Sequence, residues 1–319
     1  MRYVLSFAAA ACCFAATVER DPADLGVPFS RYTTTDAHGR RITFYLSAGN
    51  GQPQPMAVFV QGSGCDSVFR RAGDRVAGGY QSVLRSAAKG RALVMAVEKA
   101  GVRYLDASQR PGGATGCSQE FLEQHTLPLW AGAINAAIRA ALTLVGIDPS
   151  GVLVAGHSEG AIVAARVAAG NSQVTHVALL AGGGPTQLFQ RAEDARQKGG
   201  DAAAESVYKA WAEIEKDPES TAKFFQGHPY RRWSSFMVTS PIQELLRSNA
   251  RIYAAQGTRD ATVPIVELDV LRAELAAHKR DAVIERIEGA DHSLNKEGQA
   301  APAGMREVLE RVVAWFVQR

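Results

Sequence analysis

Cysteine, charge of one sign and long apolar runs are all scarce in this sequence. The 319 residues include 4 cysteines, and no Cys-x-x-Cys or His-x-x-x-His spacing occurs, so a dedicated zinc or haem site has no support. The formal net charge is only +3, and the basic residues are scattered rather than gathered into a stripe, which argues against nucleic acid as a partner. The phosphate-binding patterns Gly-x-Gly-x-x-Gly and Gly-Lys-Ser/Thr are missing as well, and we expect no cofactor.

The one apolar run at the start of the chain is short. Arg2 precedes an apolar stretch over residues 3–16, and the polar "ERDPADLG" follows almost at once. A membrane-spanning helix needs about 20 apolar residues, whereas this layout is typical of a secretory signal peptide. We therefore predict a signal peptide over residues 1–17, export to the periplasm or the medium, and no transmembrane span in the mature chain. Lipid attachment at Cys12 or Cys13 and a buried N-terminal helix are the alternatives.

Removal of such a leader leaves two cysteines, Cys65 and Cys117. An even number of cysteines in an oxidising compartment favours a disulfide. We predict that Cys65 and Cys117 are bonded; the alternative is two separate buried thiols.

The remaining chain alternates short apolar runs with stretches of helical length. Most of the runs are rich in Val, Ile, Leu and Phe with little polar alternation, as in strands that are covered on both faces. The predicted strands begin near residues 41, 56, 92, 152, 176, 251 and 282, and the predicted helices cover 127–145, 161–169, 263–278 and 302–318. This order predicts a three-layer α/β/α fold with a mostly parallel central sheet, whose first strands can pair antiparallel.

One connection is far longer than the few residues that usually join neighbouring elements. Charged helical sequence fills the gap between the strands near residues 176 and 251, and "KGGDAAAES" inside it indicates a turn between two helices. We predict a helical cap at 186–248, inserted into one catalytic domain that covers 18–319.

The stretch "VLVAGHSEGAIVAARVAA" places a serine between a buried strand and a helix. Gly156 and Gly160 flank Ser158 in a Gly-x-Ser-x-Gly pattern, and glycines let neighbouring backbone approach at a tight turn. In this context the pattern predicts a nucleophile elbow. A neutral serine hydroxyl needs a general base, so Ser158 calls for a histidine partner.

Among the seven histidines, His292 in "IEGADHSLN" follows a predicted strand at the same sheet edge as the elbow. His157 is adjacent to the serine, but neighbours on a tight turn point apart. The base needs a carboxylate that fixes its tautomer. Asp260 in "QGTRDATVP" closes another strand at that edge, and Asp291, beside His292, is its rival.

The order Ser158, Asp260, His292, each after a buried strand, resembles the α/β-hydrolase superfamily from about residue 41 to the C-terminus. The resemblance implies an oxyanion hole, for which we expect backbone N–H groups of Glu159 and of Ser63, with Gly64 as its neighbour. Many relatives begin the latter loop with His-Gly, whereas this chain has Gln61-Gly62.

We therefore predict a serine hydrolase that acts on a small-molecule acyl substrate, most simply a carboxylic ester. A serine peptidase or a thioesterase of the same fold is one alternative, and a non-catalytic ligand-binding protein is another. The cap aromatics Phe224, Phe225 and Trp233 are candidates for an acyl pocket, with packing as their alternative role. Arg231 and Arg232 are expected to be solvated, with binding of a carboxylate as the alternative.

Overall fold

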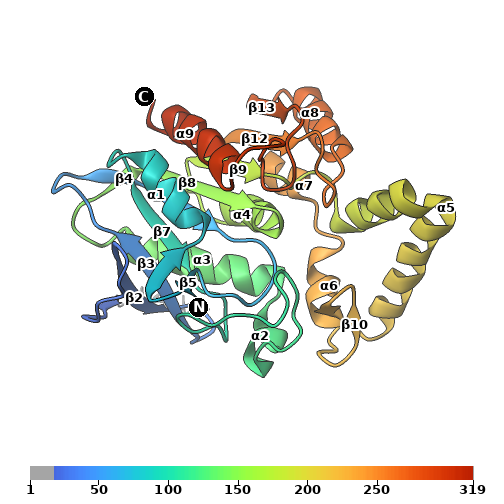
Figure 1. Cartoon of the computed structure of the whole chain (residues 1–319), viewed down its shortest axis with the longest axis horizontal. Helices are drawn as coiled ribbons and strands as arrows, with labels where there is room; N and C mark the ends of the chain where they lie inside the picture. The colour runs from blue at the N-terminus through green and yellow to red at the C-terminus, as the bar shows by residue number, and fades with distance from the viewer. Residues whose placement is uncertain (1–17, 319) are drawn as a thin grey trace, which may run out of the picture.

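A mostly parallel sheet forms the centre of the structure, a computed structural model that describes residues 18–318 (Figure 1). The predicted signal peptide lies outside these residues. The strands of the sheet are β1 (Glu19–Arg20), β2 (Phe29–Thr35), β3 (Arg41–Ser47), β4 (Gln54–Val60), β7 (Leu93–Val97), β8 (Ile147–His157), β9 (His176–Leu180), β12 (Arg251–Gly257) and β13 (Ala282–Ile287). Their order is β1-β2-β3-β7-β4-β8-β9-β12-β13; β1 to β3 pair antiparallel, β3 also pairs antiparallel with β7, and the others pair in parallel. This confirms the predicted fold class.

Helices cover both faces of the sheet. On one face, α1 (Tyr80–Ala88) and α9 (Ala303–Val317) pack on the strands; on the other lie α3 (Leu127–Ala141), α4 (Glu159–Ala169), α7 (Pro241–Arg247) and α8 (Val266–Ala277). Each face buries its own hydrophobic cluster, as the apolar strands require, because neither side of such a sheet meets water. The short helix α2 (Gln119–Gln124) and the hairpin β5 (Phe69–Ala72) to β6 (Arg75–Gly78) lie in the connections.

Several boundaries differ from the sequence prediction. The helix predicted over 127–145 ends at Ala141, and Val145 is fully exposed before Gly146 turns the chain with a φ of +91°. The sequence reading also missed α1, β1 and β2. The strand β2 reads "FSRYTTT", a polar-rich pattern that lacks the apolar run used to find the other strands.

The long connection between β9 and β12 holds helices and two very short strands. We call residues 186–248 the insert; its elements are α5 (Gln187–Lys216), β10 (Phe224–Phe225), β11 (His228–Pro229), α6 (Tyr230–Phe236) and α7. In Figure 1, α5, α6 and β10 stand to one side of the layered core. The backbone leaves helical geometry at Gly199 and Gly200, in the predicted turn, whereas α7 packs on α4 in the core. The cap boundary at residue 248 stays a prediction.

None of the helices within 18–318 is long and apolar enough to cross a membrane. The structure joins Cys65 and Cys117 in a disulfide, as predicted, with 5.9 Å between the two Cα atoms.

Candidate active site

Ser158 stands at a sharp turn between β8 and α4. Its φ of +57° and ψ of −122° are rare for a residue with a side chain, and such strain persists only where the surrounding structure enforces it. The flanking glycines enforce it here. A Cβ on Gly156 would lie 1.9 Å from the carbonyl oxygen of Gly160, and a Cβ on Gly160 would lie 2.2 Å from that of Val60. The turn therefore holds the serine at the carboxyl end of the sheet.

A chain of hydrogen bonds connects Ser158, His292 and Asp260. The Oγ atom of Ser158 lies 3.0 Å from Nε2 of His292, and Nδ1 of His292 lies 2.8 Å from Oδ2 of Asp260. The other oxygen of Asp260 accepts the backbone N–H groups of Thr262 and Val263, at 2.8 and 2.9 Å. The Asp260 side chain is wholly buried, while that of His292 is 25% exposed, so the carboxylate is fixed and the imidazole can still reach a substrate.

The two rivals from the sequence have structural roles. Asp291 accepts the backbone N–H groups of Ser293 and Asn295 and so shapes the loop that carries His292. His157 does not simply point away: its Nε2 lies 2.8 Å from the backbone oxygen of His292. Burial lowers the pKa of His157 to about 4, so the ring is neutral and donates one N–H to that oxygen. Both residues hold His292 in place.

The loop after β4 runs beside the serine. A Cβ on Gly62 would lie 3.5 Å from that of Ser158, and Ser63 lines the same cavity as Ser158. Glu159 is the first residue of α4, so its backbone N–H has no acceptor within the helix. Gly64 has a φ of +94° and packs against Gly112, which leaves Ser63 as the loop residue that faces the serine. These positions suit two donors for an oxyanion.

Lys99 connects these two donor segments. Its Nζ donates to the backbone oxygens of Gly62 and Gly64, at 2.5 and 2.7 Å, and lies 3.8 Å from Oε1 of Glu159. The side chain is wholly buried, and burial lowers the pKa of Lys99 to about 8 against the attraction of Glu159. The carbonyl of Gly62 belongs to the same peptide unit as the N–H of Ser63, so the ammonium group fixes the direction of that N–H; its second bond holds the peptide unit that follows Gly64.

The side chain of Glu159 is the centre of a buried ion cluster that the sequence analysis missed. Its Oε1 lies 2.9 Å from Nε2 of His125, and its Oε2 accepts from Nη2 and Nε of Arg232, at 2.6 and 3.1 Å. Burial by itself would raise the pKa of Glu159, but Arg232, His125 and Lys99 outweigh it and hold the pKa well below the ordinary value. Glu159 is therefore ionised.

Arg232 requires a correction, since we expected it to be solvated. Its side chain is 2% exposed, and its guanidinium group lies over the rings of Trp233 and Phe236, with 4.0 and 4.3 Å to the ring centroids. Arg232 thus does meet a carboxylate, that of Glu159, and this ion pair joins α6 of the insert to the helix that begins after Ser158. Trp233 and Phe236, one and four positions after Arg232, were the sequence signal that this arginine could be buried between aromatic rings.

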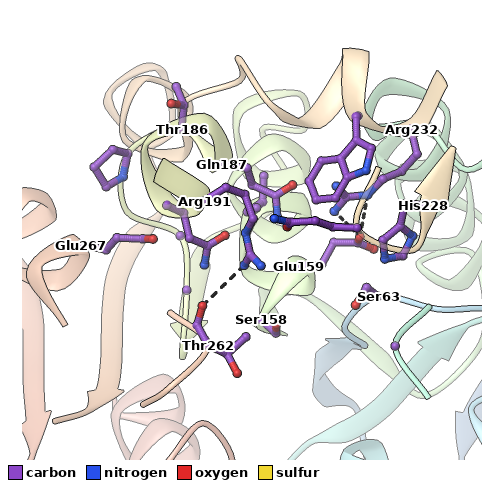
Figure 2. Close-up of a pocket in the computed structure, with 18 residues that line it drawn as sticks. Ser63, Ser158, Glu159, Thr186, Gln187, Arg191, His228, Arg232, Thr262 and Glu267 are labelled. Atoms are coloured by element: carbon purple, nitrogen blue, oxygen red, sulfur yellow. Dashed lines mark hydrogen bonds and ion pairs between the residues drawn. The ribbon is translucent and has the colours of Figure 1, made fainter. Parts of the chain in front are cut away.

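A cavity of about 250 Å³ opens beside Ser158, between the sheet edge and the insert (Figure 2). Trp233 lines it, but Phe224 is 42% exposed and Phe225 packs edge-on against Trp233. The predicted aromatic pocket is therefore reduced to Trp233. Most of the remaining lining is polar, with Gln187, Arg191 and Glu267 drawn around the serine in Figure 2. No cluster of three metal-ligating side chains occurs in the described part of the chain.

The disulfide supports one wall of this site. Cys65 follows the Gly62–Gly64 loop, and Cys117 ends a loop that includes Gly112, a cavity residue. That second loop reaches the insert, because the backbone N–H of Ala114 donates to the oxygen of Gly227 at 2.9 Å. The bond therefore lies between the Gly62–Gly64 loop and the segment that contacts the insert.

Comparisons with known proteins agree with this architecture. The family model described as "Dienelactone hydrolase family" matches residues 209–319. No curated protein matches the chain.

Solved structures resemble nearly the whole chain. An acetyl xylan esterase from Paenibacillus sp. R4 is 17% identical, with a TM-score of 0.58 over 95% of this chain and 89% of that one. A putative dienelactone hydrolase from Klebsiella pneumoniae is 16% identical, with a TM-score of 0.55 over 96% and 100%. Dipeptidyl peptidase 4 of Porphyromonas gingivalis is 13% identical, with a TM-score of 0.61 over 91% of this chain and 36% of that one. At these identities the likeness shows the fold.

Proposed function

The chain has the fold of the α/β-hydrolase superfamily, and on this premise we propose that it is a serine hydrolase that cleaves small carboxylic esters through an acyl-enzyme. The observation that carries the proposal is the hydrogen-bonded series Ser158, His292, Asp260 at the elbow. Each bond falls within the range expected between a nucleophile, its base and the group that orients the base. The cavity of about 250 Å³ supports a small substrate, and the esterases among the structural neighbours support an ester.

The first half of the reaction forms the acyl-enzyme. His292 takes the proton of Ser158 as the serine oxygen attacks the ester carbonyl, and Asp260 stabilises the imidazolium ion that results. The carbonyl oxygen becomes an oxyanion and accepts the backbone N–H groups of Glu159 and Ser63. His292 then gives its proton to the leaving alcohol, the C–O bond breaks, and the acyl group stays on Ser158.

The second half repeats these steps with water. His292 removes a proton from water, the hydroxide attacks the acyl carbon, and the carboxylic acid leaves while Ser158 recovers its proton. Lys99 acts throughout as a positioning residue, because it holds the peptide units of the oxyanion loop through the oxygens of Gly62 and Gly64. A donor that is already aimed at the oxyanion costs no reorganisation during the reaction.

The same proposal extends to location and to the insert. An exported protein would form the Cys65–Cys117 disulfide in an oxidising compartment, and the bond in the structure supports export. The insert would act as a cap over the catalytic domain, since it supplies one wall of the cavity beside Ser158.

Labelling with a fluorophosphonate tests the central claim. We expect the purified protein to be modified at Ser158, located by peptide mapping, because only an activated serine reacts with this probe. The variants Ser158→Ala and His292→Ala should each abolish labelling and the hydrolysis of phenyl acetate.

Ser172→Ala and His278→Ala are matched controls, since both residues are exposed. They should label and turn over substrate as the original protein does. An unlabelled but folded original protein, or labelling that survives in Ser158→Ala, would refute the serine mechanism.

A further inference from the structure

The cavity beside Ser158 is lined by buried polar atoms that have no partner in the protein. Four of these atoms come from the two helices of the insert nearest the serine and one each from the β11 strand and α8. They are Oε1 of Gln187, Oε1 of Gln190, Nε of Arg191, Nη1 of Arg232, Nδ1 of His228 and Oε1 of Glu267. Buried polar groups are normally hydrogen-bonded, and leaving one without a partner destabilises a protein. Six in one cavity indicate a site built for a polar ligand.

The side chains that carry these atoms are nearly all buried. Apart from Arg191, none of these side chains is more than 6% exposed. In Figure 2 the labelled members of this set lie around Glu159 and Ser158. A substrate bound at the serine would therefore come within reach of several of them together.

The charges in this lining have a definite sign. Glu159 is ionised, and the cations Arg232 and Lys99 lie against it. Burial raises the pKa of Glu267 to about 8 and lowers that of His228 to about 3, so both are mainly neutral at pH 7. Asp260 is paired with His292. The carboxylates of Glu159 and Asp260 are thus set against three cations, Lys99, Arg191 and Arg232, which leaves one positive charge in excess.

Arg191 has the weakest partners of all the charged residues here. Its Nη2 makes one long contact of 3.5 Å with the backbone oxygen of Thr262, and its Nε makes none. Arg191 as a whole is only partly buried, but its Nε is buried and unpaired, and a carboxylate would complete this donor with a charge-assisted hydrogen bond. The second free donor, Nη1 of Arg232, lies in the same cavity.

The three free oxygens do not oppose an anion. The side-chain amides of Gln187 and Gln190 can turn by 180° and present N–H groups at the same places. The carboxyl group of Glu267 is mainly protonated and can donate as well.

From this arrangement we propose that Arg191 and Arg232 bind a carboxylate of the substrate, so that the natural substrate is a small ester that also carries a free carboxylate. The inference rests on the proposed function, because it places the ester bond of the same molecule at Ser158. The insert supplies both arginines, and the insert therefore selects the substrate.

Matched esters test the charge. Monomethyl succinate and dimethyl succinate differ in one charge, and release of acid can be followed in a pH-stat. Hydrogen bonds to charged groups contribute about 1.5–3 kcal/mol, so we expect kcat/KM for the monomethyl ester to exceed that for the dimethyl ester by about 10-fold to 100-fold. Equal values, or a preference for a neutral sugar acetate over both, would overturn the proposal.

Variants of the insert test whether Arg191 causes the preference for the monomethyl ester. Arg191→Gln should lower the ratio of the two kcat/KM values about 10-fold, and Arg191→Lys should restore part of it because the charge returns. Arg196→Gln lies on the same helix, in an exposed position, and should leave the ratio as it is. A ratio that Arg191→Gln does not change would contradict the assignment.

A binding measurement separates this inference from the proposed function. Calorimetric titration of the original protein with succinate and with succinamide needs no turnover. We expect succinate to bind at least 10-fold more tightly, and Arg191→Gln to remove the difference. Tighter binding of succinate without labelling at Ser158 would refute the hydrolase and keep the anion site, whereas ester hydrolysis with equal binding of the two ligands would refute the anion site alone.

Discussion

The two sides of the cavity beside Ser158 are built in opposite ways. On the sheet side, Asp260 uses both oxygens and His292 uses both ring nitrogens in hydrogen bonds within the protein. On the insert side, Gln190 and Arg191 face the same space with atoms that have no partner. The sheet edge is thus complete before a substrate arrives, while the insert is completed by one. The difference indicates that reaction and selection are assigned to separate segments of the chain.

Breaking the sheet side should have the largest effect. Asp260→Asn removes the carboxylate that sets the tautomer of His292, and a change of this kind lowers kcat by about 10⁴-fold. Asp291→Asn, one residue before His292, should lower it by less than about 10-fold, because Asp291 bonds only backbone N–H groups of its own loop. Steady-state kinetics with phenyl acetate measures both. Similar losses in the two variants would mean that the assignment of the carboxylate is wrong.

Removing the ion pair between Arg232 and Glu159, which connects the insert to the sheet side, should lower the free energy of unfolding. Arg232→Met leaves the carboxylate of Glu159 buried without the two hydrogen bonds that its Oε2 accepts, and the loss of one partner of a buried ion pair typically costs about 3–5 kcal/mol. Urea unfolding followed by circular dichroism measures the change. The double variant Glu159→Gln/Arg232→Met also removes the unpaired carboxylate and should recover part of the lost free energy of unfolding. The two single variants each lower the free energy of unfolding by some amount. If the double variant lowers it by more than these two amounts added together, electrostatic pairing is not what joins α6 to α4.

The disulfide tests how far the loops support the contact with the insert. Cys65→Ala/Cys117→Ala should lower the free energy of unfolding by about 2–4 kcal/mol, the usual contribution of such a bond. The loop before Cys117 contacts the insert at Gly227, so limited proteolysis should cut the insert faster in the variant. Reduction of the original protein with dithiothreitol should reproduce both changes, and an unaltered cleavage rate would show that the insert is held without the bridge.

Replacing Lys99 should have a smaller effect on catalysis than replacing Asp260. Lys99→Met removes the ammonium group that holds the oxygens of Gly62 and Gly64, and we expect kcat to fall about 10-fold to 100-fold with less change in KM. The pKa of Lys99 is lowered to about 8, so the charged form is present below that pH and is lost above it. In the original protein, kcat should therefore decline as the pH rises through about 8.

Two variants assign that decline. The buried carboxyl group of Glu267 has its pKa raised to about the same value as that of Lys99, so each residue is replaced in turn. If Lys99 is the titrating group, the decline in kcat should be absent in Lys99→Met and present in Glu267→Gln. If the decline disappears in Glu267→Gln instead, the titrating group belongs to the substrate cavity and not to the oxyanion loop.

The sequence predicted the parts of this molecule that follow from local pattern. Gly156 and Gly160 predict the elbow because only glycine fits the contacts made there. His292 and Asp260 could be predicted because each follows an apolar strand, and parallel strands end at the same edge of the sheet. The helix α1 was missed because it is short and half polar. The strand β2 was missed because it is rich in polar residues; it lies next to the two-residue edge strand β1, which pairs with only two of its residues.

The ion cluster could not be found in the same way. Lys99, His125, Glu159 and Arg232 come from four separate segments, and no spacing rule connects them. Their association depends on how the insert packs against α4, which is a tertiary property. Arg232 looks like half of a solvated Arg-Arg pair in sequence, and only its burial between two aromatic rings shows its role.

The ion pair between Arg232 and Glu159 also limits how this protein can be modified by recombination. A segment taken from a relative and exchanged for residues 186–248 would bring its own side chains to the start of α4, next to the serine. Unless the donor supplies a cation at the place of Arg232, the exchange leaves an ionised carboxylate with too little compensation. The insert and the core are therefore separate segments of the sequence that cannot be exchanged independently: a chimera that keeps Glu159 must also keep the arginine that pairs with it.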